Sequence, residues 1–428
     1  MLPELSTAIP GPRSLALAGA LRRHECRNVT YLAEDWPIFW QRAEGVNVWD
    51  ADGNRFLDLT SAFGVCGLGH GNAALREALL GQAEQLMHAM GDVHPTAVKA
   101  QLCAELSAIT FERWGRGDGK TILGNSGFEA VEAALKTALL RTGKPGVIAF
   151  TGGYHGLGFG ALAATGIPFF RDPFRAQLRE FATFLPYPAD AAQLEAALAR
   201  GDIGAILVEP VQGRGGCVVP PRDFLPMLRA VCDAHGLLLI ADEIYTGFHR
   251  TGALFACDHS GVVPDLVCVG KALTGSFPLS ACVGRAEVMD AWPHSTGEAL
   301  HTSTFLGNPM GCAMALASLR RHRDPALAGL VRERGARLRA ALEAVHSPHL
   351  REVRGLGLML GMELTEPTPH VAVGIVKRAL SDGFLLLADS PTGHVLSFAP
   401  PFAIADDEIA FVAARLQEYF TALPGSIS

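Results

Sequence analysis

Three groups of residues have types and positions that could do chemistry on a carbonyl or an amine. Lys271 directly follows the aliphatic run LVCVG at 266–270, so its amine is expected to be partly desolvated, which favours the neutral, nucleophilic form. Asp242 follows the run LLLIA, where a carboxylate needs a cation or several donors. Asn125-Ser126-Gly127 comes just before a helical pattern, and the free backbone N–H groups at such a turn bind phosphate well.

Each of these signals has an ordinary alternative when taken alone. Lys271 could be a lysine that reaches the surface, Asp242 could cap the helix that follows it, and Ser126 could do no more than cap a helix. Together, a Schiff-base lysine, an aspartate for a ring nitrogen and a phosphate cradle are what pyridoxal 5'-phosphate requires of a protein.

The elements that must position these residues alternate along the chain from about residue 121 onward. Short β-like runs and helical patterns follow one another as KTILG, FEAVEAALKTALL, GVIAF, AILVEP, FLPMLRAVCDAHG, LLLIADE and LVCVG. This alternation predicts an α/β domain with a mostly parallel sheet flanked by helices, in which ligand groups gather at the carboxyl ends of the strands. The polar stretches at those ends are 125–127, 209–216, 242–247 and 270–271.

The two ends of the chain predict a second, smaller α+β domain. WDADGNRFLDLTS reads as a hairpin with Asp52-Gly53 at its turn, and after about residue 318 a long helix precedes the strand-like runs EVRGLGLMLGMEL and VLSFAPPFAI. We therefore expect residues 1–75 and 320–428 to form the small domain around a large cofactor-binding domain at 76–319.

Composition excludes several classes of partner. The chain has 428 residues, 49% of them hydrophobic, and a formal charge of -7 with scattered Lys and Arg, so we expect neither nucleic acid nor membrane as a partner. Nine cysteines without a C-x-x-C pair predict reduced thiols, no metal site and a cytoplasmic protein. The N-terminal segment lacks the pattern of a signal peptide.

Motifs along nearly the whole chain resemble those of the class III aminotransferases, the pyridoxal-phosphate enzymes that include ornithine, acetylornithine and 4-aminobutyrate aminotransferases. In family order they are WDADGNRFLDL, NSGFEAVEAALK, YHG, EPVQG, ADEIYTGFHRTG, VGKALTGSFPLSA, HTSTFLGNP, RGLGLMLGMEL and FAPPFAI. The resemblance implies the fold-type I architecture, pyridoxal phosphate as cofactor, and an obligate homodimer with shared active sites.

The resemblance also implies roles for individual residues. Lys271 is similar to the lysine that binds the cofactor covalently and then moves the substrate proton, and Asp242 to the partner of the pyridine N–H. Tyr154 would stack on one face of the ring and Ile244 would pack on the other, and His155 belongs to the expected cofactor-binding residues with a structural rather than a catalytic role. The remaining cofactor contacts that we predict come from Ser126, Gly127, Phe128, Glu209, Tyr245 and, from the partner subunit of the dimer, the residue equivalent to Thr304.

The chain departs from the family pattern where substrates bind. Leu157 stands where many relatives carry an Arg after YHG, Ser397 replaces a second carboxylate-binding Arg, and Arg214 replaces the Glu that partners that second Arg. We expect Arg214 to supply the missing contact with a substrate carboxylate; the alternative is that Arg214 points to solvent or pairs with a carboxylate such as Glu243. Phe63, at the place of a substrate-touching aromatic, and Leu157 indicate an apolar pocket, unless such side chains are simply core, while Tyr245 replaces a common Gln near the cofactor oxygen.

The sequence thus predicts an aminotransferase that moves an amino group from an amine or an ω- or β-amino acid to a 2-oxo acid by a ping-pong mechanism. A racemase or epimerase, an aminomutase or a lyase on the same fold is the nearest alternative. A nucleotide-binding dehydrogenase built on GLGFGA at 156–161 and a catalytically silent binding protein are the others. Two segments resemble a P-loop but depart from its motif. WGRGDGKT lacks the first glycine at the required position, and LVCVGKALTG has Ala272 where Ser or Thr is required.

Overall fold

The computed structural model describes residues 1–365 and 369–423, and the chain divides into two compact units. The first contains Met1–Asn72 and the C-terminal segment from Leu330, and the second contains Ala73–Gly329. Within the described ranges, no helix is both long enough and apolar enough to cross a membrane.

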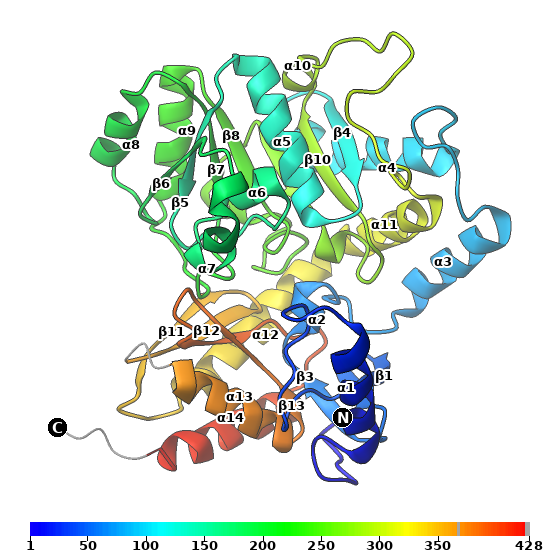
Figure 1. Cartoon of the computed structure of the whole chain (residues 1–428), viewed down its shortest axis with the longest axis vertical. Coiled ribbons are helices and arrows are strands. Elements are labelled where there is room, and N and C mark those ends of the chain that lie inside the picture. Colours follow the sequence, from blue (N-terminus) through cyan, green and yellow to red (C-terminus); the bar gives the residue numbers. More distant parts are fainter. Residues whose placement is uncertain (366–368, 424–428) are drawn as a thin grey trace. The chain divides into compact units, whose positions relative to one another are not determined.

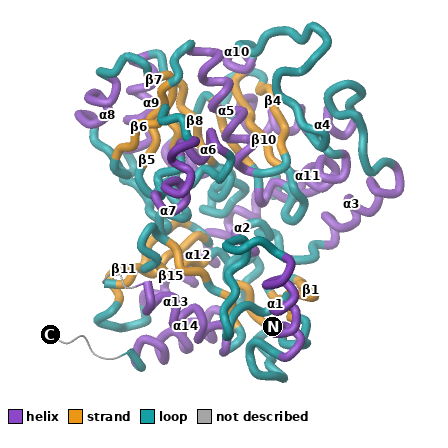
Figure 2. The backbone as a smooth tube through the Cα atoms, viewed as in Figure 1, coloured by secondary structure: helices purple, strands orange, loops and turns teal. Residues whose placement is uncertain are grey.

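The second unit is built on a sheet of seven strands in the order β4-β10-β9-β8-β7-β5-β6. Strands β5 to β9 pair in parallel, whereas β10 runs antiparallel between β4 and β9. The tube drawing separates the strands of this sheet from the helices around them (Figure 2). The strands are β4 Gly119–Gly124, β5 Gly146–Phe150, β6 Ala182–Leu185, β7 Ile203–Val208, β8 Leu238–Asp242, β9 Leu266–Val269 and β10 Ser280–Arg285.

Helices cover both faces of this sheet, which is why its central strands read as continuous apolar runs. In β7, Ala205 and Leu207 pack with helix α5, while Ile206 and Val208 pack with helices α8 and α9 on the opposite face. Figure 1 shows α5 lying across the strands, and α8 with α9 at the far end of the sheet. The helices of this unit are α3 Ala73–Gln85, α4 Ala97–Ser107, α5 Gly127–Thr142, α6 Phe159–Ala164, α7 Pro168–Arg171, α8 Ala191–Leu198, α9 Phe224–His235, α10 Ala286–Met289 and α11 Pro309–His322, with short turns η1 Ala108–Glu112, η2 Asp172–Gln177, η3 Ala256–Ser260 and η4 Lys271–Leu273.

The first unit combines helices with two four-stranded sheets, ordered β1-β2-β3-β13 and β11-β12-β15-β14. The hairpin predicted around Asp52-Gly53 is confirmed, because β2 and β3 pair antiparallel and Gly53 adopts the positive φ of 89° that its turn requires. Its elements are α1 Pro12–His24, β1 Trp40–Glu44, β2 Asn47–Asp50, β3 Arg55–Asp58, α2 Ser61–Gly64, β11 Leu350–Leu356, β12 Met359–Leu364, α13 Pro369–Ser381, β13 Phe384–Leu385, β14 Leu387–Asp389, β15 Val395–Phe398 and α14 Asp406–Thr421, while α12 Pro325–Glu343 crosses the boundary between the units.

The predicted α/β fold class, with a mostly parallel sheet in the large domain and an α+β unit from both termini, is confirmed. The strand-like runs predicted from the sequence did not include β6, and they did not include β10. Strand β10 follows β9 after only the ten residues 270–279, too few for the helical crossover that a parallel return needs, so the chain comes back antiparallel.

Candidate active site

Four neighbouring parallel strands bring the predicted chemistry to one edge of the sheet. Their order β9-β8-β7-β5 places Lys271, Asp242, Glu209 and Tyr154 at or just beyond adjacent carboxyl ends. Open sheets of this kind bind their ligands at this edge. Fold topology therefore gathers residues that lie up to 117 positions apart in the chain.

Asp242 is a buried carboxylate whose two oxygens both have partners. Its Oδ2 lies 2.8 Å from Nδ1 of His155, and its Oδ1 accepts the backbone N–H of Ile244 at 3.1 Å. The backbone N–H of His155 donates in turn to Oγ1 of Thr165 at 3.1 Å. The imidazole therefore fixes the orientation of the carboxylate, and the bond to Ile244 shows that Asp242 also caps the turn after its own strand.

Glu209 is a second buried carboxylate, and it ties two loops together. Its Oε2 accepts the backbone N–H of Tyr154 at 2.9 Å and its Oε1 accepts that of Gly213 at 3.2 Å. Burial raises the pKa of Glu209 to about 7, with His155 and the two N–H donors acting in the opposite direction. Glu209 thus fixes the loop after β5 against the loop after β7.

Lys271 follows β9 in a backbone conformation that L residues rarely adopt, with φ at 42°. A residue keeps such a strained backbone only where its surroundings hold it in place, and strained residues of this kind cluster at functional sites. Its Nζ lies 4.3 Å from the ring centroid of Tyr245, in the range of a cation–π contact. The half-buried Tyr245 therefore lies beside the lysine.

The start of helix α5 is the place where the sequence predicts an anion cradle. The carboxylate of Glu129 accepts the backbone N–H of Ser126 at 2.8 Å and also that of Asn125, while Oγ of Ser280 donates to the carbonyl of Ser126 at 2.7 Å. Among the described residues, the N–H groups of Gly127 and Phe128 have no acceptor. These two donors at a helix N-terminus suit a phosphate group.

Close backbone approaches hold this cradle beside the other site residues. A Cβ at Gly127 would lie 3.0 Å from Cδ1 of Ile244, and one at Gly270, just before the lysine, would lie 3.5 Å from Cγ2 of the same Ile244. A Cβ at Gly156 would overlap Phe128 at 2.4 Å. A phosphate cradle, an apolar contact and a buried acid therefore occur together, and they fit pyridoxal phosphate.

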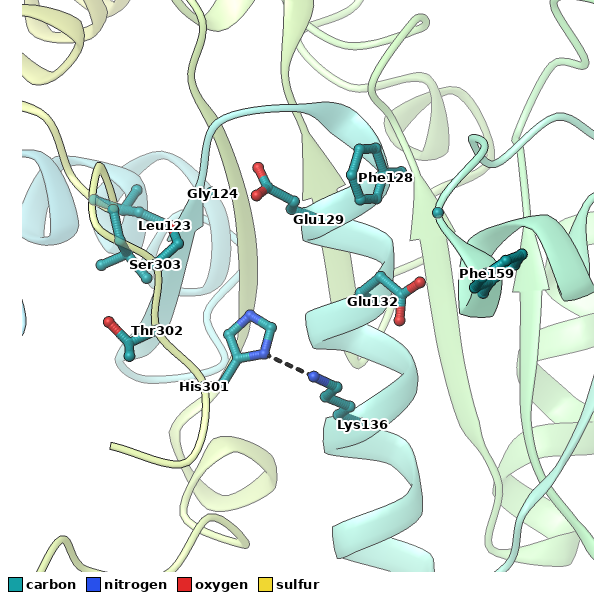
Figure 3. Close-up of a pocket in the computed structure, with 12 residues that line it drawn as sticks. Leu123, Gly124, Phe128, Glu129, Glu132, Lys136, Phe159, His301, Thr302 and Ser303 are labelled. Atoms are coloured by element: carbon teal, nitrogen blue, oxygen red, sulfur yellow. Dashed lines mark hydrogen bonds between the residues drawn. The ribbon is translucent and has the colours of Figure 1, made fainter. Parts of the chain in front are cut away.

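A pocket adjoins the outer side of α5 (Figure 3). Figure 3 shows Phe128 and Glu129 on the first turn of the helix, Lys136 further along it, and His301 with Ser303 on the facing loop. The Nζ of Lys136 lies 3.1 Å from Nδ1 of His301, and burial and this ammonium lower the pKa of His301. Nδ2 of Asn125 donates to Oγ of Ser303 at 3.3 Å, so the loop that carries Thr304 reaches the edge of the cradle.

Most of the predicted cofactor and substrate residues lie in the unit Ala73–Gly329. Leu157 is exposed and Arg214 half-buried in this unit, whereas Phe63 and Ser397 belong to the other unit, and their place in a substrate pocket stays a prediction. Arg214 does not pair with Glu243, whose oxygens accept the backbone N–H groups of Ala256 and Cys257 at 2.9 and 2.8 Å and the hydroxyl of Thr246.

Sequence reasoning missed three residues that shape the site. Ser280 holds the cradle, Gln212 bridges the loops after β7 and β5 through a bond from its Nε2 to the carbonyl of Thr151 at 3.0 Å, and Phe170 packs on Tyr154 with ring centroids 5.4 Å apart. The serine and the glutamine stand inside the motifs VGKALTGSFPLSA and EPVQG, so a signal existed for them. For Phe170 the sequence offered no signal apart from the adjacent pair Phe169-Phe170.

Known proteins resemble the chain over almost its full length. The family model of the class III aminotransferases matches residues 31–420. The 4-aminobutyrate aminotransferase of Mycobacterium leprae is 34% identical over 95% of both chains, and the acetylornithine aminotransferase of Methanopyrus kandleri is 38% identical over 90% of this chain and 94% of its own. The solved structure of ornithine aminotransferase from Toxoplasma gondii, in which pyridoxal phosphate partly occupies the active site, is 31% identical with a TM-score of 0.84 and covers 95% of this chain and 94% of its own.

The chain therefore belongs to the class III aminotransferases. It is a pyridoxal-phosphate-dependent enzyme that transfers amino groups.

Proposed function

We propose that Lys271, Asp242 and the first turn of α5 are the parts of this aminotransferase that hold and use the cofactor. Pyridoxal phosphate, when bound, supplies an electron sink for the carbon that carries the amino group. The observation that carries the assignment is the meeting of a lysine, a buried acid and a free helix N-terminus at one edge of the sheet.

Each residue has its own task in this proposal. The Nζ of Lys271 would hold the cofactor covalently, and as a free amine it would move the proton of the substrate carbon. Asp242, oriented by His155, keeps a proton on the ring nitrogen. The N–H groups of Gly127 and Phe128 hold the phosphate.

The remaining predicted contacts complete the proposed cofactor site. Tyr154 and Ile244 would cover the two faces of the ring, and Tyr245 would contact the ring oxygen. Ser126 orders the cradle, and Glu209 acts by fixing the loop of Tyr154. The exposed Leu157 lies on the donor side in this proposal and favours an amine or an ω- or β-amino acid.

We further propose that the enzyme is a homodimer in the cytoplasm, with the partner subunit's Thr304 completing the phosphate site. Thr304 is exposed, and apolar side chains stand exposed on its own segment and on the segment 86–93. They are Leu300 at 73%, Phe305 at 58%, Met87 at 60% and Met90 at 57%. A second copy of the chain would remove this apolar surface from water.

Reduction with borohydride and mass spectrometry test the lysine assignment. We expect the parent protein to gain the cofactor mass on Lys271, and Lys271→Ala to lose both the covalent mass and amino transfer. Lys120→Ala, at an exposed lysine, is the matched control and should keep both. A parent protein whose cofactor mass is found on another lysine would reject the assignment.

A second measurement separates amino transfer from a racemase, aminomutase or lyase reaction. An amino donor given without acceptor should convert the cofactor stoichiometrically to its pyridoxamine form, which the addition of a 2-oxo acid should reverse. A spectrum that returns to its starting form without any acceptor would favour the alternative reactions.

A further inference from the structure

The loop after β7 holds Arg214 on a backbone that is fixed at several points. Gln212 and Val218 exchange two backbone hydrogen bonds of 3.1 and 3.0 Å, and Cys217 donates to the carbonyl of Gly213 at 3.1 Å. Glu209 accepts the N–H of Gly213. The arginine therefore projects from the tip of a short turn that has little freedom to move.

The side chain of Arg214 lies beside a pair of aromatic rings that contact each other, a pair that we call the clamp. Its Cζ lies 5.5 Å from the ring centroid of Tyr154 and 5.5 Å from that of Phe170, and these two rings meet at an interplanar angle of 65°. Aromatic faces attract a guanidinium and restrict where its planar fork can point. The clamp of Tyr154 and Phe170 thus orients the cation in advance.

Arg214 lacks a matching anion among the residues that the structure describes, since none of their carboxylates forms a salt bridge with it. Two other half-buried arginines of this unit, Arg229 and Arg285, both pair with Asp265, at 2.7 and 2.6 Å. A half-buried cation gains most from an anion that can share its desolvated surroundings. The guanidinium of Arg214 is therefore available to bind an anionic ligand.

The clamp adjoins the proposed cofactor site. Tyr154 is followed by His155, which contacts Asp242, and Glu209 binds the backbone of both Tyr154 and the residue before Arg214. We infer that Arg214 binds the carboxylate of the 2-oxo acid acceptor, an inference that rests on the aminotransferase function proposed above. Its two outer nitrogens bind the two carboxylate oxygens side by side, and the aromatic rings wall the site.

Binding of a carboxylate that cannot react tests the inference directly. Calorimetric titration of the holoenzyme with propionate, and with the neutral propionamide of the same shape, separates charge from shape. We expect Arg214→Gln to weaken propionate binding at least tenfold and to leave propionamide binding unchanged, with Arg214→Lys between Arg214→Gln and the parent. Arg222→Gln, at an exposed arginine on the same connection between β7 and α9, is the matched control and should bind as the parent does.

Three outcomes would overturn the inference. They are a parent that binds propionate no better than propionamide, an Arg214→Gln variant with parental propionate affinity, and a variant that loses both ligands equally because Arg214 merely supports Tyr154. Unfolding and cofactor content measured on each variant identify the last case.

Kinetics with pyruvate distinguish failure of this inference from failure of the proposed function. In the half-reaction that returns the amino group to pyruvate, Arg214→Gln should raise KM at least tenfold with a smaller change in kcat. An unchanged KM with a lowered kcat would contradict carboxylate binding. A parent that transfers no amino group, yet binds propionate through Arg214, would refute the proposed function and leave the carboxylate site standing.

Discussion

At Gly156 the structure predicts a steric clash for any larger residue. Gly156 has φ at 117°, and an added Cβ would lie 2.4 Å from Cβ and 3.1 Å from Cα of Phe128. Real Cβ atoms do not approach other carbons so closely, and the obstacle is partly backbone. Gly156→Ala must therefore displace the start of α5, where the N–H groups for the phosphate lie.

The size of the effect follows from two costs. An L residue forced into this backbone region costs about 1–3 kcal/mol, and an overpacked side chain adds about 1–3 kcal/mol. Gly297 has a similar φ of 124° with no atom near its Cβ direction, so Gly297→Ala carries at most the first cost. We expect Gly156→Ala to lose about 1–3 kcal/mol more than Gly297→Ala in the free energy of unfolding.

Cofactor binding should separate the two variants further. One charge-assisted hydrogen bond to the phosphate contributes about 1.5–3 kcal/mol, and its loss weakens affinity roughly 10- to 100-fold. We expect Gly156→Ala to bind pyridoxal phosphate more weakly by this factor. Gly297→Ala should bind it with the parental affinity. Urea unfolding and cofactor titration of both variants measure the two effects. Equal unfolding and equal affinity would show that Gly156 does not approach Phe128 in the folded protein.

Two further predictions concern pH. Burial raises the pKa of Glu209 from 4.5 to about 7, so the folded protein holds this proton more tightly than the unfolded chain. The contribution of Glu209 to the free energy of unfolding should therefore fall by about 3 kcal/mol between pH 4.5 and 7 and no further above. Burial also raises the pKa of Glu243, to about 6, so Glu209→Gln should reduce the slope in urea unfolding rather than abolish it, and a variant with the parental slope would contradict the assignment. Burial opposes the charging of His70, but its hydrogen bonds to Asp58 and Cys66 outweigh burial and raise its pKa from 6.5 to about 9. The contribution of His70 to the free energy of unfolding should therefore be complete below pH 6.5 and lost as pH rises through 9. An NMR titration of the His70 ring checks this, and a midpoint at or below 6.5 would contradict it.

The sequence could single out Lys271 and Asp242 as candidate reactive residues because their local surroundings are distinctive. Asp242 ends β8 and Lys271 follows β9 by two residues, and both strands are buried on both faces, so that their sequences are uninterrupted apolar runs. The hairpin at Gly53 was equally local, since a turn residue with positive φ has a compositional signature. Motif resemblance then supplied the order of the remaining cofactor residues. The domain boundaries expected after residues 75 and 319 stay a prediction.

Contacts between distant loops could not be predicted in the same way. His155 contacts Asp242, 87 positions further along the chain, and Glu209 accepts the N–H of Tyr154, 55 positions before it. The hydrophobic periodicity of a sequence gives no information about such distant pairs. The direction of β10 depended on the length of the connection after Lys271 rather than on the composition of the strand. Side-chain hydrogen bonds between strand ends become visible only when the strand order is known.

The arrangement explains how the substrate side of the site can change while the cofactor side stays intact. Glu209, just after β7, and Asp242, at the end of β8, each hold the loop after β5, one through the backbone of Tyr154 and the other through the ring of His155. The positions of these residues are therefore set by strand pairing, which substitutions at the loop tips do not alter. Arg214 and Leu157 stand at such tips, so exchanging a cation at either of them should, on the proposal made above, change which carboxylate can bind and leave the geometry beside Lys271 in place.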